Sequence, residues 1–135
     1  MMTYGTVTNL DDLERIVRTQ GTVYLRYSKE VETDSASLDG ESGLRLPGLS
    51  VNPLSPEAWW TRPLKDWLAR QICQYKHLGD KQGRQAWILA GQCVGRGPDC
   101  EPLIDQVRAL GRLDEQLLVE AEQAYTELFD TGREP

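Results

Sequence analysis

The segment QAWILAGQCV, residues 85–94, constrains the fold of this chain more than any other. Residues 86–90 are apolar, and the segment becomes more polar after them. An apolar run of this length between polar hinges is typical of a strand buried on both faces of a sheet. We therefore expect residues 85–94 to form a central strand.

The rest of the chain predicts shorter strands and several helices. Helices are expected over residues 8–21, 62–79 and 114–129, and strands over 22–28, 49–51 and 103–109. Thr8 or Asn9 can cap the first helix and Gly21 can end it, whereas Asp114 caps the last one. Ser55, followed by a proline and an acidic residue, predicts a further helix start.

These elements define the expected fold class as α+β, with a small mixed or antiparallel sheet of three to five strands packed with three or four helices. Helices and strands do not alternate regularly enough for a doubly wound sheet. One domain is expected over residues 1–130, with a mobile acidic loop at about 29–46 and a frayed tail at 131–135.

Composition excludes several classes of function. The chain has 135 residues and a formal net charge of −6, which argues against general nucleic-acid binding. No apolar run approaches the roughly 20 residues that a membrane helix needs. Three cysteines without C-x-x-C spacing and a single histidine give little support for a metal site. The odd cysteine count and the lack of a leader segment predict a cytoplasmic protein.

Arg26 is the first candidate functional residue. It lies in the middle of the expected strand 22–28, next to Tyr27 and on the opposite face. An arginine in a strand loses solvation unless it meets an anion or a carboxylate. Arg26 either binds a phosphate or carboxylate group of a ligand, or pairs with an acidic side chain on the solvent face of an edge strand.

Three further polar and aromatic features are candidates. Ser50 can contact a sugar or phosphate oxygen, or can bond its own backbone in a turn. Of the adjacent Trp59 and Trp60, one can be buried while the other covers a pocket or stacks on a flat ligand. In the loop GRGPDCEP, residues 95–102, Glu101 either points into a cleft or is solvated at the end of a rigid connector.

The chain resembles a family of small uncharacterised actinobacterial proteins, a domain of unknown function. The segments that carry this resemblance are GTVYLRYS, ESGLRLPGLSVNPLSPEAWW, WLARQICQYKHL and GRGPDCEPLI. This resemblance implies no activity for the chain.

A second resemblance is to ADP-ribosyltransferase-like folds, which use an arginine, a serine and a glutamate on successive strands. Arg26, Ser50 and Glu101 occur in that order. The resemblance implies that Arg26 contacts the pyrophosphate or ribose of NAD and that Ser50 orients the nicotinamide ribose. It also implies that Glu101 stabilises the transition state, with Tyr27 or Trp60 stacking on the nicotinamide.

Two hypotheses of function follow. In the first, the chain is an enzyme that binds NAD or a related nucleotide, with Arg26, Ser50 and Glu101 in one cleft. In the second, it is a non-catalytic module that binds a partner protein through the acidic loop and the surface of Trp59 and Trp60. The two tryptophans are equally compatible with a homodimer contact.

Overall fold

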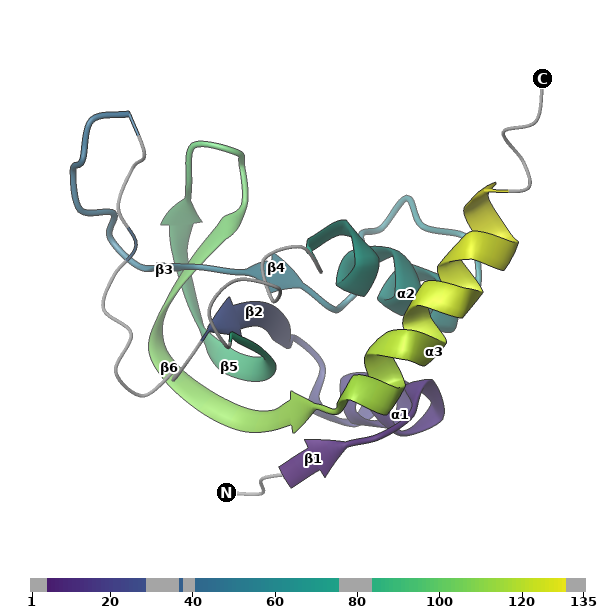
Figure 1. Ribbon diagram of the computed structural model, residues 1–135. Coiled ribbons are helices and arrows are strands. Elements are labelled where there is room, and N and C mark those ends of the chain that lie inside the picture. Colours follow the sequence, from purple (N-terminus) through teal and green to yellow (C-terminus); the bar gives the residue numbers. More distant parts are fainter. Residues whose placement is uncertain (1–4, 29–36, 38–40, 76–83, 131–135) are drawn as a thin grey trace.

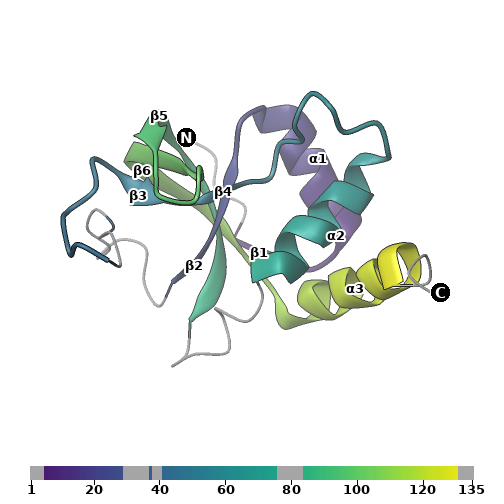
Figure 2. The ribbon, with the colours of Figure 1, turned by 90° about the horizontal axis from the view of Figure 1, so that it is seen from above.

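The computed structural model describes residues 5–28, 37, 41–75 and 84–130. Its elements are β1 (Gly5–Val7), α1 (Leu10–Gln20), β2 (Tyr24–Ser28), β3 (Leu49–Ser50), β4 (Asn52–Pro53), α2 (Leu64–Tyr75), β5 (Gln85–Arg96), β6 (Pro102–Leu113), α3 (Glu115–Tyr125) and a π-helical turn (Thr126–Asp130). The helices gather on one side of a coiled sheet (Figures 1 and 2). The expected α+β class is confirmed, and the sheet has six strands in the described residues rather than three to five.

The predicted central strand is confirmed. β5 lies between β2 and β6, and Ile88 pairs with Leu25 on one side and Gly111 on the other. Ile88 and Leu89 are fully buried. Beyond Ala90 the strand becomes exposed and continues, paired with β6, to Arg96. The buried half therefore organises the core, and the exposed half forms a hairpin arm with β6.

The segment of β3 and β4 connects the two sides of the sheet. β3 pairs antiparallel with the start of β6, where Leu49 lies opposite Ile104. β4 pairs with β2, where Asn52 lies opposite Leu25. Between them the amide of Val51 donates to the Pro102 carbonyl at 3.1 Å. One short stretch of chain therefore brings β2 close to the tip of the β5–β6 hairpin.

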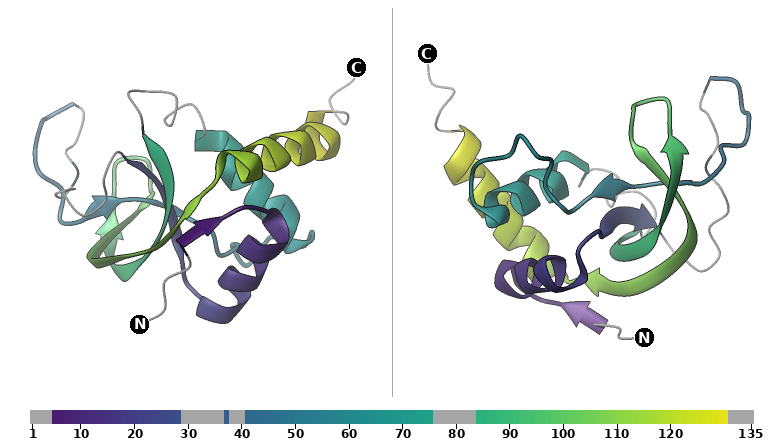
Figure 3. Two further views of the ribbon diagram at one scale, coloured as in Figure 1. Left: turned by 60° about the horizontal axis from the view of Figure 1, so that its bottom comes forward. Right: turned by 180° about the vertical axis from the view of Figure 1, so that it is seen from behind.

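The β5–β6 hairpin is bent strongly enough to allow this connection (Figure 3). Its pairing register shifts at three places along β5, and such bulges increase strand twist. At Gly91 the strands approach so closely that a Cβ would lie 2.9 Å from the Asp105 carbonyl oxygen. Glycine at this position is thus part of what curves the sheet.

Two apolar clusters fill the two faces of the sheet. The main cluster lies between the sheet and the helices and includes Leu25, Tyr27 and Trp67. The second lies on the opposite face and includes Tyr24 and Leu89. Leu25 and Tyr27 of β2 belong to the main cluster and Tyr24 belongs to the second, as expected of a strand whose successive side chains face opposite sides of the sheet.

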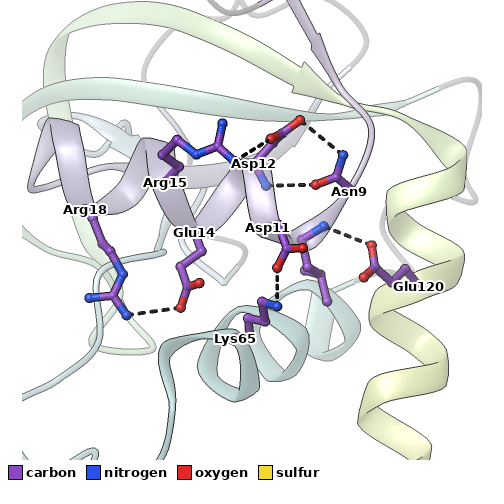
Figure 4. Close-up of polar contacts among 9 residues, drawn as sticks. Asn9, Asp11, Asp12, Glu14, Arg15, Arg18, Lys65 and Glu120 are labelled. Carbon is purple, nitrogen blue, oxygen red and sulfur yellow. Dashed lines mark hydrogen bonds and ion pairs between the residues drawn. The ribbon is translucent and has the colours of Figure 1, made fainter.

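Polar contacts hold the three helices together (Figure 4). Asn9 caps α1, as predicted, by accepting a hydrogen bond from the Asp12 amide at 2.8 Å. Glu120 of α3 accepts from the Leu10 amide at 2.9 Å, so α3 supplies a second acceptor for the first turn of α1. Lys65 of α2 pairs with Asp11.

Two predictions about helices are wrong. Ser55 does not start a helix: its hydroxyl donates to the Gly21 carbonyl at 2.6 Å, and α2 begins only at Leu64. Ser55 therefore stabilises the end of α1, a tertiary contact that outweighs its local capping preference. The helix expected over residues 114–129 is α-helical only to Tyr125, and Leu128, in the π-helical turn that follows, is 37% exposed.

Two expected segments lie wholly or mostly outside the described residues. The tail at 131–135 is outside them, and so is most of the acidic loop at 29–46. Among the helices that the structure describes, none is both long and apolar enough to cross a membrane.

Candidate functional site

A cleft of about 220 Å³ opens beside the segment of β3 and β4, where it passes between β2 and the hairpin tip. The cleft is lined by Arg26, Tyr27, Ser50, Asn52, Arg84, Asp99 and Glu101. Four of the five predicted site residues, all except Trp60, are in this set.

Arg26 reaches the cleft from β2, on the face away from the helices. Its cross-strand neighbour on β5 is Trp87, whose indole nitrogen donates to the Ser28 carbonyl at 3.0 Å. The Nη1 of Arg26 donates to the backbone carbonyl of Ser50 at 2.7 Å. Its guanidinium therefore ties β2 to β3 and brings a positive charge to the cleft wall.

Ser50 joins β3 to the hairpin tip. Its hydroxyl donates to Glu101 Oε2 at 2.5 Å, a short distance typical of a hydroxyl bonded to a carboxylate. Its amide donates to the Ser37 hydroxyl at 2.9 Å. Ser50 thus uses its carbonyl, amide and side chain, and its orientation in the cleft is set from three directions.

The turn between β5 and β6 holds the Glu101 carboxylate in place. The Gly97 amide donates to the Glu101 carbonyl at 2.8 Å, and the Cys100 amide donates to the Gly97 carbonyl at 3.0 Å. The Asp99 amide donates to Glu101 Oε1 at 3.0 Å. Each carboxylate oxygen therefore accepts one hydrogen bond. The loop 95–102 is both a rigid hairpin turn and one wall of the cleft, so the two interpretations of it are compatible.

The cleft contains charges of both signs. Arg26 and Arg84 contribute two positive charges, and Asp99 and Glu101 contribute two negative ones. Guanidinium groups bind phosphate or carboxylate, and carboxylates accept hydrogen bonds from hydroxyl groups. In the described part of the chain, no cluster of three metal-binding side chains occurs. This set of groups suits a small polar ligand that has both an anionic group and hydroxyls.

Of the two aromatic candidates, Tyr27 contributes to the lining of the cleft and Trp60 does not. The Tyr27 ring is buried in the main core, where its hydroxyl donates to the Ile72 carbonyl at 3.1 Å. Trp60 packs on Trp67 of α2, with ring centroids 5.2 Å apart, and is not one of the residues that line the cleft. Trp60 is therefore not placed to stack on a ligand held by Glu101.

Sequence reasoning missed Asn52 and Arg84 and assigned no site role to Asp99. Asn52 lies in β4, Arg84 immediately precedes β5, and Asp99 is in the hairpin turn. The sequence could have indicated Asp99 as a residue of the cleft, because it lies two residues from Glu101 in the same loop. No sequence pattern indicates Arg84 or Asn52, because their approach to the cleft depends on how β2, β4 and β5 pair.

A second cavity adjoins the cleft. It measures about 330 Å³ and includes Tyr27 and Arg84 in its lining, as the cleft does. Its other walls include Gln85, Arg112 and Asp114, at the start of β5 and before α3. Arg112 donates to the Gln85 side chain at 2.6 Å. The polar surface of the cleft therefore continues past Arg84.

Three of the four tryptophans form a separate aromatic cluster near the start of α2. Trp67 is buried, whereas Trp59 is 64% exposed. The Trp59 ring contacts Trp60 and Trp67 edge-on, at centroid distances of 6.1 and 5.8 Å. The Arg70 guanidinium lies 6.0 Å from the centre of the Trp59 ring. Of the adjacent pair, Trp59 is exposed and Trp60 is half-buried against Trp67, and neither lines the cleft.

Fold and cleft together define a small α+β protein with a polar site between its coiled sheet and its hairpin tip. The chain belongs to a family of unknown function, DUF6098, whose family model matches residues 2–134. The resemblance to an uncharacterised domain is thereby confirmed. No curated protein and no solved structure matches the chain.

Proposed function

We propose that the chain binds NAD or a related nucleotide in this cleft, through the ribose hydroxyls and a phosphate. The observation that carries the proposal is the meeting of Arg26, Ser50 and Glu101 at one cleft. These residues are separated by 24 and 51 positions along the chain and are joined by two hydrogen bonds. Their convergence creates a surface that none of the three segments has alone.

The side chains that line the cleft support the binding of a nucleotide. The Glu101 carboxylate is an acceptor for ribose hydroxyls, while Arg26 and Arg84 supply positive charge for a phosphate. The Asn52 amide offers both a donor and an acceptor. A purely apolar ligand would leave these groups desolvated without partners, which is costly.

The volume of the cleft limits which part of the ligand it encloses. Pockets for drug-sized ligands measure roughly 300–1,000 Å³, and this cleft, at about 220 Å³, is smaller. It therefore accommodates a ribose and one phosphate. The rest of a dinucleotide extends past Arg84 toward the adjoining cavity of about 330 Å³.

The resemblance to ADP-ribosyltransferase-like folds supports a reaction at the bound ribose. When the bond between nicotinamide and ribose breaks, positive charge develops on the sugar, and a fixed carboxylate stabilises that charge. Glu101 takes this role in the proposal, with Ser50 orienting it. With water as the acceptor, NAD yields nicotinamide, ADP-ribose and a proton.

Measurement of nicotinamide release from NAD tests the reaction. Glu101→Gln keeps the shape of the side chain but removes its charge, and we expect it to lower the rate by ~100-fold or more. Glu57→Gln is the matched control, because Glu57 is exposed and does not line the cleft. No release by the wild-type protein, or equal rates for wild type and Glu101→Gln, would contradict the catalytic role.

The exposure of Trp59 favours a second candidate function, the binding of a partner protein. An exposed tryptophan beside an arginine is typical of a binding hot spot. The partner segment would offer an apolar or aromatic side chain to Trp59 and a carboxylate to Arg70. Selection from a random displayed peptide library tests this: wild type should enrich peptides with that pairing, and Trp59→Ala should not. Enrichment of the same peptides by both proteins would exclude this surface.

A further inference from the structure

Gly97 occupies the place in the hairpin turn over which the Glu101 side chain folds back. A Cβ on residue 97 would lie 2.5 Å from Glu101 Cδ and 2.6 Å from its Oε2. These distances are shorter than any that real Cβ atoms show in practice. A side chain at position 97 and the observed position of the Glu101 carboxylate therefore exclude each other.

The backbone at Gly97 does not give way to such an overlap. Its amide donates to the Glu101 carbonyl and its carbonyl accepts from the Cys100 amide, so the turn is closed on both sides. Gly97 is not among the residues with positive φ, so its backbone conformation itself permits an alanine. The conflict is therefore confined to the end of the Glu101 side chain, which must leave its hydrogen bonds to Ser50 and Asp99 to make room for a Cβ.

We propose that Gly97 is a positioning residue of the cleft: its missing side chain leaves the space in which the Glu101 carboxylate meets Ser50. This inference rests on the proposed function, in which Glu101 contacts the ligand. It extends that function to Gly97, which acts through the space that it leaves for the Glu101 carboxylate. Of the two reasons for a glycine in such a turn, positive φ and close approach, only close approach applies here.

Gly95 provides the matched control. It lies two residues earlier in the same hairpin, and a Cβ there would meet nothing within 4 Å. Gly95→Ala and Gly97→Ala change the backbone entropy of the unfolded chain equally. Any difference between the two variants therefore reports the contact with Glu101.

Amide NMR tests the position of the carboxylate without a ligand. The Asp99 amide donates to Glu101 Oε1. Gly97→Ala should move the Asp99 resonance upfield and speed its hydrogen exchange, as Glu101→Ala should, while Gly95→Ala should leave both unchanged. An Asp99 amide that is the same in wild type and Gly97→Ala would overturn the inference. This result does not depend on nucleotide binding.

A double-mutant cycle with ADP-ribose as the probe then separates the inference from the proposed function. Gly97→Ala should weaken binding by about 10-fold, the loss expected for a hydrogen bond to a charged group. In a Glu101→Ala background the same substitution should have no further effect, because the carboxylate is already gone. Additive losses would overturn the positioning role. If wild type does not bind, the proposed function fails, and the NMR result alone decides the role of Gly97.

Discussion

The Ser50 hydroxyl and the Glu101 carboxylate lie 2.5 Å apart, and this hydrogen bond attaches the tip of the β5–β6 hairpin to β3. It spans 51 positions in the chain. Arg26 reaches the same point from β2 through the Ser50 carbonyl. In the proposed function, the stability of the cleft and the binding of a ligand therefore depend on the same contacts.

Removal of either partner of this bond should destabilise the protein. We expect Ser50→Ala to lower the free energy of unfolding by about 1–2 kcal/mol, as for a hydrogen bond to a charged group that is partly solvated. Urea denaturation of Ser50→Ala, Glu101→Ala and the double variant measures the coupling. The double variant should lose less than the sum of the single losses. Strict additivity would mean that the two side chains do not interact in solution.

Gly91→Ala should disturb the bend of the hairpin. A Cβ at residue 91 would lie 2.9 Å from the Asp105 carbonyl oxygen, which is backbone and has little room to move. We expect a loss of about 1–3 kcal/mol, the range found for overpacked sites. Thermal denaturation compares this variant with Gly95→Ala, where the Cβ is unobstructed. Equal midpoints for both variants would contradict the close approach.

The buried Tyr24 should make stability depend on pH in alkaline solution. Burial raises the pKa of Tyr24 above its ordinary value of 10.0, Cys93 raises it further, and Arg96 acts in the opposite direction. The folded protein keeps this proton after the unfolded chain has lost it. The free energy of unfolding therefore decreases as the pH rises through 10.

Phenolate absorbance measures this ionisation directly. The chain has five tyrosines, and Tyr24→Phe should reduce the amplitude of the late-titrating phase by one tyrosine. The decrease in stability above pH 10 should become smaller in the same variant. A late phase of unchanged amplitude would show that Tyr24 titrates normally.

The contact between α3 and α1 should contribute measurably to the helix layer. Glu120 accepts a hydrogen bond from the Leu10 amide and places negative charge at the positive end of α1. Glu120→Ala should cost about 1 kcal/mol. Gln123→Ala, on the exposed side of α3, is the control and should be nearly neutral. Equal denaturation midpoints for the two variants would show that the Glu120 contact adds no stability.

The parts of the fold that follow from local patterns were predictable from the sequence. The first helix has its cap at Asn9 and its end at Gly21, and both are confirmed. The burial of Ile88 follows from an apolar run that needs no knowledge of its partners. Ser55 shows the limit of such reasoning, because its local capping signal is overridden by the distant Gly21 carbonyl.

The cleft was predictable only in part. Arg26, Ser50 and Glu101 stood out as polar residues in unusual places, but their convergence depends on the pairing of β3 with β6, which no local pattern specifies. The same holds for Arg84, whose position depends on where β5 lies against β2. Trp60 was grouped with the site because the ADP-ribosyltransferase resemblance implies a ring that stacks on the nicotinamide, whereas the ring of Trp60 packs on Trp67 in another cluster.

Calorimetric titration with ADP-ribose tests most directly whether this cleft binds a nucleotide. Wild type and Glu57→Gln should each bind one equivalent with the same affinity. Glu101→Gln, which keeps the shape of the side chain but loses the charge bonded to Ser50, should bind at least about 10-fold more weakly. No heat of binding with wild type, or an unchanged affinity in Glu101→Gln, would contradict a nucleotide site built on Glu101.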